Sequence, residues 1–385
     1  MAKMGHNFFS ISFDLITVDQ PINYDLYVNS STSENKEKFV RIFPKDDIIN
    51  LEDLKNFKKK YFQLYVHESQ RELYLKSFVH ASNIPDSQKS EVIKDSAIHY
   101  LDKLFDENKE FTTELLSKTI QGCKTTVESM VDVIKDYDVS KLQSLIATLS
   151  FHDFYTYDHS INVSMYCIAL YTAARPKAPK EEIVLAGLGG LLHDIGKVKI
   201  STEIINNPNK LTEEEFAIIK KHPTYGYNLL VENPCSCEGV DFNIIKRIIH
   251  EHHENFNGSG YPDNLSGLDI HLLARITAIA DFFDAITTKR SYHEVLPTED
   301  AIAVMAKSVG KKLDPELFKI FTKSVKQLVL MGRINKELPD DFDPCRPQNV
   351  LPLRVPQPTY KIEGFANKET EEKEKVFKKI KKKIA

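Results

Sequence analysis

The sequence predicts a mainly α-helical protein in which a small α+β domain precedes an all-helical domain. Residues 142–330 carry apolar side chains at helical spacing, with short connections and almost no strand pattern. Alternation of apolar and polar residues, which is typical of half-buried strands, is confined to roughly the first 80 residues. The chain of 385 residues is 42% hydrophobic and 28% charged, which is enough apolar material for a sizeable core.

Residues 1–84 are predicted to form the small α+β domain. Strand alternation occurs at Phe9–Phe13 and Phe39–Phe43, and the polar loop Asn29–Lys36 lies between them. Three further elements are expected in the order helix, strand and helix: from Asn50, over Tyr61–Val66 and over Glu68–Phe78. We interpret this segment as an input or regulatory domain, and no motif in it identifies the signal.

Residues 85–141 are predicted to be connecting helices. Apolar side chains recur there at three- and four-residue spacing, and Gly122 is expected to end the first helix. Such helices either connect an input domain to an output domain or cap a helical core. Core packing is favoured, because the apolar repeat is not sustained over the several heptads of a coiled coil. Long helices of this kind are also compatible with a homodimer.

Residues 336–385 are predicted to be an extended segment followed by a charged tail. Six prolines lie between Pro339 and Pro358, and proline fixes φ and lacks a backbone donor. Val376–Ile384 then forms a short basic amphipathic pattern. Its narrow apolar face favours a solvated tail over a helix that binds a membrane surface or a partner.

The composition argues against several classes of protein. Lys and Arg number 51 against 55 Asp and Glu, so no basic field favours DNA as a partner. The N-terminus does not resemble a signal peptide, and the longest apolar run, Ile183–Leu192, is about half the length of a membrane span. Five cysteines, an odd and mostly scattered set, make a poor disulfide framework. We therefore expect a cytoplasmic protein without a membrane span.

Imidazoles and carboxylates gather in the helical half of the chain, where nine of the thirteen histidines lie between His152 and His293. His193-Asp194 ends an apolar helix, His252-His253 is predicted to lie on another helix, and Asp281 and Asp284 share a face of a third. His159 and His222 begin or lie within two further helices. A single histidine on an apolar face is usually a core residue, but this ordered set indicates a metal site. Imidazole and carboxylate without paired thiols suit iron, manganese or zinc in hydrolytic sites.

The chemistry that fits such a donor set is phosphoester hydrolysis. The carboxylate of Asp194 has two oxygens and can bridge two cations. Two metals about 3.5–4 Å apart can hold a hydroxide between them and clamp a phosphate for in-line attack.

Five segments carry a resemblance to a known family: Tyr155–Val163, Leu192–Lys197, His222-Pro223, His252–Glu254 with Gly258–Pro262, and Asp281–Ala285 followed by Arg290. With these motifs, residues 142–330, about half of the chain, resemble an HD-GYP domain, a subgroup of the HD phosphohydrolases. The resemblance implies an all-helical HD-type metal-dependent phosphohydrolase domain, to which we assign residues 142–335. It also implies a cyclic-di-GMP phosphodiesterase that gives pGpG, GMP or both.

Residue by residue, the resemblance implies two divalent metal ions, for which iron or manganese is favoured. The first would be held by His159, His193, Asp194 and Asp281, and the second by Asp194 as the bridge, His222, His252 and His253. Lys197 would approach the bridging solvent or the scissile phosphate, where a fixed cation stabilises transition-state charge. Tyr261 and Arg290 would contact the dinucleotide, and Asp284 would orient a ligand or an arginine.

Some positions depart from the family pattern. Tyr155 occupies the position of a glutamate that binds a third metal in some relatives, so two metals are expected here. Asn257 and Ser291 replace an aspartate and a proline, and neither change removes a metal ligand. Between His222 and His252 lies an apparent insertion with Cys235 and Cys237. Two thiols alone make an incomplete metal site, and an exposed loop is favoured over a metal site or a redox pair.

Two alternatives remain beside the leading interpretation. The first is hydrolysis of another cyclic dinucleotide, such as cyclic GMP-AMP, because the contacts that select the base are not apparent in the sequence. The second is a metal-loaded sensor with little turnover, or a module that docks on diguanylate cyclase domains through the Gly258–Pro262 loop. The complete ligand set and Lys197 favour the enzyme, since a sensor need not retain them.

Overall fold

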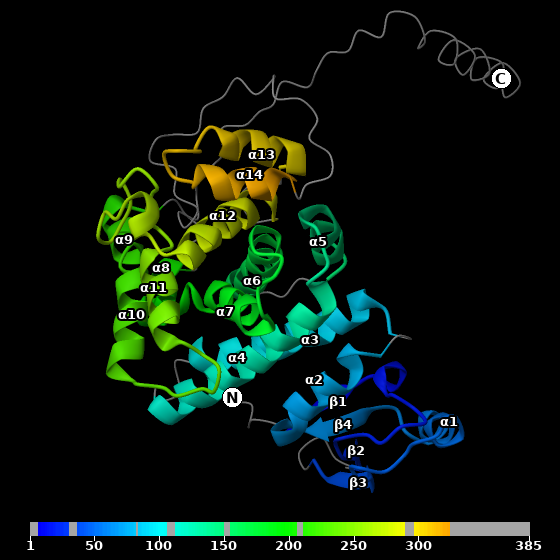
Figure 1. Cartoon of the computed structure of the whole chain (residues 1–385). Coiled ribbons are helices and arrows are strands. Elements are labelled where there is room, and N and C mark those ends of the chain that lie inside the picture. Colours follow the sequence, from blue (N-terminus) through cyan, green and yellow to red (C-terminus); the bar gives the residue numbers. More distant parts are fainter. Residues whose placement is uncertain are drawn as a thin grey trace, which may run out of the picture.

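The computed structural model describes residues 7–30, 37–81, 84–105, 112–149, 155–205, 211–288 and 296–323. Within these ranges the protein is mostly helical with one small sheet, which confirms the predicted fold class (Figure 1). No helix among the described residues is both long and apolar enough to span a membrane. The proline-rich segment and the basic tail within 336–385 lie outside the described residues.

The N-terminal part is built on a four-stranded antiparallel sheet with the strand order β1-β4-β2-β3. Its strands are β1 (Phe8–Ile11), β2 (Leu26–Asn29), β3 (Phe39–Phe43) and β4 (Leu64–His67). Strand β2 was not predicted. It is only four residues long, and its two inward side chains, Leu26 and Val28, are buried. The predicted strand Phe9–Phe13 is wrong at its end, because Ser12 caps a 3-10 turn at Phe13–Leu15.

Two helices accompany the sheet, α1 (Leu51–Lys60) and α2 (Arg71–Val79). Helix α1 begins at the predicted position, where Asn50 and Asp53 form a capping box. Helix α2 follows a 3-10 turn at Glu68–Gln70. Glu68 accepts hydrogen bonds from Arg71 at 2.7 and 2.9 Å, and His99 Nε2 lies 3.1 Å from its carboxylate. Burial raises the pKa of Glu68, but these hydrogen bonds and charges outweigh it and lower the pKa to about 2.

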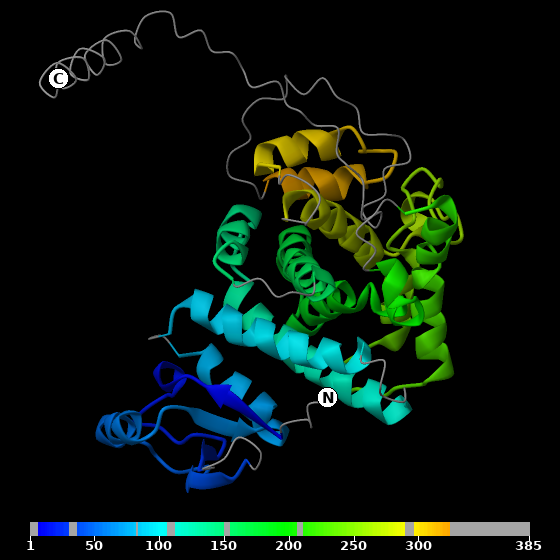
Figure 2. The same ribbon diagram turned by 180° about the vertical axis from the view of Figure 1, so that it is seen from behind.

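Helices α3 (Asp86–Phe105) and α4 (Thr113–Ile134) lie between the sheet and the remaining helices (Figures 1 and 2). The prediction that Gly122 ends a helix is wrong, because Gly122 lies inside α4. A Cβ atom there would be 2.2 Å from the Tyr100 ring, so the glycine allows α3 and α4 to approach closely. Both helices bury apolar side chains in one continuous hydrophobic cluster that extends from Ile11 to Phe321.

The helices that carry the candidate site follow the short helix α5 (Val139–Ile146). Helices α6 (Tyr155–Ala174) and α7 (Lys180–Leu192) pack tightly, because the Ser164 hydroxyl donates to the Gly187 carbonyl at 2.7 Å and Gly190 lies against the Ser164 backbone. The rest are α8 (Thr202–Ile205), α9 (Glu213–Ile219), α10 (His222–Glu232), α11 (Phe242–Glu251), α12 (Leu272–Thr287), α13 (Thr298–Ala306) and α14 (Pro315–Lys323). Helix α12 packs across α6, with α13 and α14 beyond it (Figure 1).

Candidate active site

Helix ends from distant parts of the chain meet at one buried point. His159 lies in the second turn of α6, and Asp281 lies within α12. The other side chains come from the C-terminal end of α7, the N-terminal end of α10 and the C-terminal end of α11: His193, Asp194, His222, His252 and His253. All seven are buried, with relative exposures between 0% and 7%. The helix predicted to contain His252 and His253 ends earlier, at Glu251, so both lie in the turn that follows.

The seven side chains form overlapping groups of possible metal ligands. The ligand atoms of His159, His193 and Asp281 lie within 4.8 Å of one another, and the same holds for His222, His252 and His253. Asp194 lies between the two groups. Its Oδ1 is 3.2 Å from His222 Nε2, and its Oδ2 is 3.2 Å from His193 Nε2. Each oxygen of Asp194 therefore faces a different group.

The hydrogen bonds of the imidazoles fix which nitrogen faces the centre. The Nδ1 atoms of His193, His222 and His252 lie 2.7–2.8 Å from the carbonyls of Gly190, Ile219 and Ile249. A carbonyl only accepts, so each Nδ1 carries the proton and each Nε2 of a neutral ring offers a lone pair. This arrangement is typical of metal-binding histidines. The Nε2 atoms of His222 and His252 are 3.1 Å apart, a separation that a shared cation would explain.

Buried acceptors without good partners give an independent test of whether a cation fits. His193 Nε2, Asp194 Oδ1 and both carboxylate oxygens of Asp281 make no well-aligned hydrogen bond within the described residues. Buried polar atoms without partners are costly, and four at one point call for an additional positive group. Imidazole nitrogens and carboxylate oxygens suit iron or manganese as well as zinc. The residues present therefore fit a metal centre.

The pKa shifts keep most of these groups in the protonation states that bind cations. Burial, followed by the charges of neighbouring histidines, lowers the pKa of His252 and His253 well below the usual range. Burial also lowers the pKa of His222 to about 4, against the opposing effect of Asp194. Burial raises the pKa of Asp194, but the charges of His193 and Lys197 outweigh it and hold the pKa well below the usual range. The rings of His222, His252 and His253 are therefore neutral, and the carboxylate of Asp194 is ionised, near neutral pH.

His159 differs because two carboxylates contact its ring. Its Nε2 is 3.1 Å from Asp281, and its Nδ1 is 2.7 Å from Asp284 Oδ2. Burial lowers the pKa of His159, but the contacts of its ring with the carboxylates of Asp281 and Asp284 outweigh burial and raise the pKa to about 9. Asn162, which the sequence analysis did not single out, donates to Asp284 Oδ1 at 2.9 Å and so fixes this carboxylate. It lies one turn after His159, which is the spacing that could have indicated it.

Lys197 lies beside Asp194 in a short 3-10 helix, Ile195–Lys199. Its Nζ donates to Asp194 Oδ2 at 2.6 Å. The preceding Gly196 packs against the start of α10, where a Cβ atom would lie 1.9 Å from the His222 carbonyl oxygen. This glycine is therefore required for Asp194 and His222 to lie so close together.

The segment after α11 folds back over the histidines. The Tyr261 ring stacks on the His253 ring, with centroids 4.9 Å apart and planes 24° apart. Glu254 Oε1 accepts from the Asp263 backbone N–H at 2.6 Å, and the Tyr261 N–H donates to the His253 carbonyl. Gly260 lies so close to the chain that a Cβ atom would be 2.2 Å from the Asn255 nitrogen. These contacts hold Tyr261 at the edge of the metal site.

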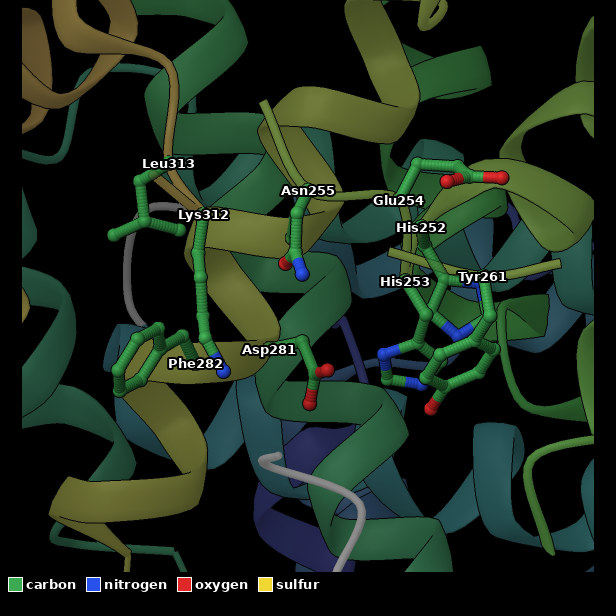
Figure 3. A pocket seen from close by; sticks show the side chains of 10 residues that line it. His252, His253, Glu254, Asn255, Tyr261, Asp281, Phe282, Lys312 and Leu313 are labelled. Carbon is green, nitrogen blue, oxygen red and sulfur yellow. The ribbon is translucent and has the colours of Figure 1, made fainter. Parts of the chain in front are cut away.

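A pocket opens beside the ligands and is shown in Figure 3. Part of its wall comes from His252, His253 and Asp281, with Tyr261 on one side. The opposite side includes Phe282 and Lys312. Lys312 was not predicted as a site residue, because it lies outside every motif and reaches the pocket only through the folding of the chain.

Not every predicted residue is described near the site. Arg290 lies outside the described residues, and so does the side chain of Tyr155. The loop that carries Cys235 and Cys237 is exposed at Pro234, Ser236, Glu238 and Gly239, as expected, although both cysteines are half-buried. The Cys237 thiol donates to Gln121 of α4 at 3.0 Å. His250 does not join the metal ligands, and its Nε2 lies 3.0 Å from Asp263.

A helical domain with buried histidines around the aspartate of a His-Asp pair defines the class of HD domains. Residues 142–317 match the family model of the HD domain, and this range contains all seven candidate ligands. Among curated proteins, a cyclic di-GMP phosphodiesterase of Pseudomonas aeruginosa is 38% identical over 199 residues, 50% of this chain and 46% of that protein. These matches confirm the resemblance of this segment to the HD-GYP family.

Two further relatives have different names. A cyclic di-GMP phosphodiesterase response regulator of Xanthomonas campestris is 38% identical over 35% of each chain. A 3'3'-cGAMP-specific phosphodiesterase of Vibrio cholerae is 33% identical over 45% of this chain and 36% of that protein. The chain spans less than half the length of each of these relatives.

Proposed function

We propose that this chain is a metal-dependent phosphodiesterase that hydrolyses cyclic di-GMP to pGpG, GMP or both. The observation that carries the proposal is the orientation of the buried imidazoles. Their Nδ1 atoms are engaged by acceptors, and the Nε2 atoms of His193 and His222 point at opposite oxygens of Asp194. The names of the relatives in Pseudomonas and Xanthomonas support the substrate.

The proposed metal ligands are the members of the two groups together with Asp194, which lies between them. His159, His193, Asp194 and Asp281 would hold one divalent ion, and Asp194, His222, His252 and His253 a second one. Two bound ions would supply a water nucleophile active near neutral pH and offset the charge of the phosphoryl oxygens. The donor set is compatible with iron or manganese as the resident metal.

The remaining roles belong to residues around the ligands. Lys197 would stabilise negative charge on the reacting phosphate, since its ammonium group already lies beside Asp194. Tyr261 would hold the dinucleotide by an aromatic contact at the pocket edge, and Arg290 would contribute a second contact. Asp284 would keep the His159 ring oriented through the 2.7 Å contact with its Nδ1.

A second substrate, 3'3'-cyclic GMP-AMP, has specific support from the Vibrio relatives that are named for it. The two dinucleotides differ in one base, so the same metal chemistry serves both. Docking of a diguanylate cyclase domain on the Gly258–Pro262 loop is a further proposal from the family resemblance. A homodimer is proposed from the long connecting helices, and a cytoplasmic location from the composition of the chain.

The test compares the metal-loaded full chain with Asp194→Asn, using Asp136→Asn as a control at an exposed carboxylate after α4. Cyclic di-GMP and 3'3'-cGAMP are incubated separately, and their products are separated by chromatography. Loss of the bridging Asp194 carboxylate should remove several kcal/mol of transition-state stabilisation, which corresponds to a loss of rate on the order of 1000-fold. The control Asp136→Asn should keep full activity. Unchanged activity of Asp194→Asn would refute the mechanism, and absence of products from the wild type would refute the function.

A further inference from the structure

Lys312 lies on a tightly bonded turn between α13 and α14. The backbone N–H groups of Lys312 and Leu313 both donate to the Ser308 carbonyl, at 2.8 and 3.1 Å. The Gly310 N–H closes the turn by donating to the Leu313 carbonyl at 2.9 Å. Buried Asp314 follows directly and accepts hydrogen bonds from the first N–H groups of α14. The backbone that carries Lys312 is therefore fixed.

The same turn is joined to the segment that carries Tyr261. The Phe256 N–H donates to the Lys312 carbonyl at 3.1 Å, and the Asn257 N–H donates to the Lys311 carbonyl at 2.8 Å. The structure thus couples two walls of the pocket through backbone hydrogen bonds. Tyr261 and Lys312 are held at a defined separation across it (Figure 3).

The side chain of Lys312 enters the pocket that the candidate metal ligands line. In Figure 3 its ammonium nitrogen extends past Phe282 on the side of Asp281, away from Tyr261. Lys197 is a second lysine at the ligand set, where it donates a hydrogen bond to Asp194 at 2.6 Å. Lys197 at the ligand set and Lys312 in the pocket supply two separate positive charges, an arrangement that suits a substrate with more than one negative charge.

We propose that Lys312 binds the second, non-reacting phosphodiester of a cyclic dinucleotide and so selects for this substrate class. The inference rests on the proposed function. A cyclic dinucleotide carries two phosphodiesters in one ring, so fixing one at the metal centre brings the other to the pocket wall. Lys197 stabilises negative charge on the reacting phosphate, and Lys312 donates a charge-assisted hydrogen bond to the second phosphodiester.

The test compares substrates with two phosphodiesters and with one. We would measure kcat and KM of the metal-loaded full chain for cyclic di-GMP and for bis(p-nitrophenyl) phosphate, which has a single phosphodiester. Lys312→Ala should lower kcat/KM for cyclic di-GMP about 10- to 100-fold, mainly by raising KM. A loss of this size corresponds to the removal of one hydrogen bond to a charged group. The kcat/KM of this variant for bis(p-nitrophenyl) phosphate should not change. Lys312→Arg should retain most of the activity.

Lys311→Ala is the matched control, because Lys311 is an exposed residue on the same turn. This variant should behave as the wild type with both substrates. An equal loss with both substrates in Lys312→Ala would overturn the assignment, since it would place the effect at the metal centre or in the fold. No loss with cyclic di-GMP would overturn it as well.

Equilibrium binding separates this proposal from the proposed function. If the wild type binds cyclic di-GMP or 3'3'-cGAMP without cleaving it, the function is refuted. The role of Lys312 is then decided by whether Lys312→Ala weakens that binding about 10- to 100-fold. If the wild type binds neither dinucleotide, both proposals are refuted.

Discussion

The buried ion pair between Lys94 of α3 and Asp158 of α6 gives a prediction with a large expected effect. Lys94 Nζ lies 2.8 Å from Asp158 Oδ1, and the two side chains are only 3% and 4% exposed. Asp158 directly precedes His159, so the pair ties the connecting helix α3 to the turn that carries a candidate metal ligand. We expect the pair to stabilise this junction.

The perturbation is Lys94→Met, which keeps the length of the side chain and removes its charge. Asp158 then remains as a buried carboxylate without its ion-pair partner, and breaking such a pair costs about 3–5 kcal/mol. At about 2–4 °C per kcal/mol for a domain of this size, the thermal midpoint should fall by roughly 6–20 °C. Asp158→Leu alone should have a similar effect, because it leaves the buried ammonium group.

The double variant Lys94→Met/Asp158→Leu provides the internal control. Replacement of a buried ion pair by apolar side chains of similar volume is often neutral or stabilising, so the midpoint should return close to that of the wild type. Thermal unfolding followed by circular dichroism measures all four proteins. If the single variants keep the wild-type midpoint, or if the double variant loses as much as the two singles together, the ion pair is not what stabilises the junction.

Three further predictions concern other parts of the molecule. Gly196→Ala should lose metal and activity, because the Cβ atom of the new alanine would lie 1.9 Å from the His222 carbonyl oxygen. The measurements are metal per chain and product formed, and retention of both would refute the tight packing of Gly196 against His222. Glu68 has a pKa lowered to about 2, so its stabilising effect is complete above the unfolded value of 4.5 and is lost as the pH falls through about 2. The difference in thermal midpoint between wild type and Glu68→Gln should therefore be largest above pH 4.5 and shrink as the pH falls toward about 2. A difference independent of pH would contradict this prediction. Tyr261→Ala should raise KM more than it changes metal content, and loss of metal in this variant would show that Tyr261 supports the ligands instead.

Much of the candidate site was accessible from the sequence because its ligands follow local patterns. The apolar run before His193-Asp194 predicts a buried helix end, and the three-residue step between Asp281 and Asp284 predicts one helix face. Their convergence could only be expected through the family resemblance, since periodicity within a helix does not say which helix ends meet. The mainly α fold followed from the same periodicity and was confirmed.

The features that the sequence analysis missed depend on contacts between distant segments. Gly122 suggests a helix end when only its neighbours in sequence are considered, but its place inside α4 is explained by the Tyr100 ring on α3. Lys312 reaches the pocket because its turn bonds to Phe256 and Asn257, more than fifty residues earlier. Neither contact leaves a periodic signal in the sequence.

Metal content and turnover, measured on one anaerobically purified sample, test the central claim most directly. We predict two equivalents of iron or manganese per chain, together with conversion of cyclic di-GMP to pGpG or GMP. Removal of the metal should abolish conversion, and its return should restore it. Two equivalents of metal with tight binding of cyclic di-GMP and no product would contradict the enzymatic account and favour a sensor. Product formation by the metal-free chain would contradict the role of the buried histidines.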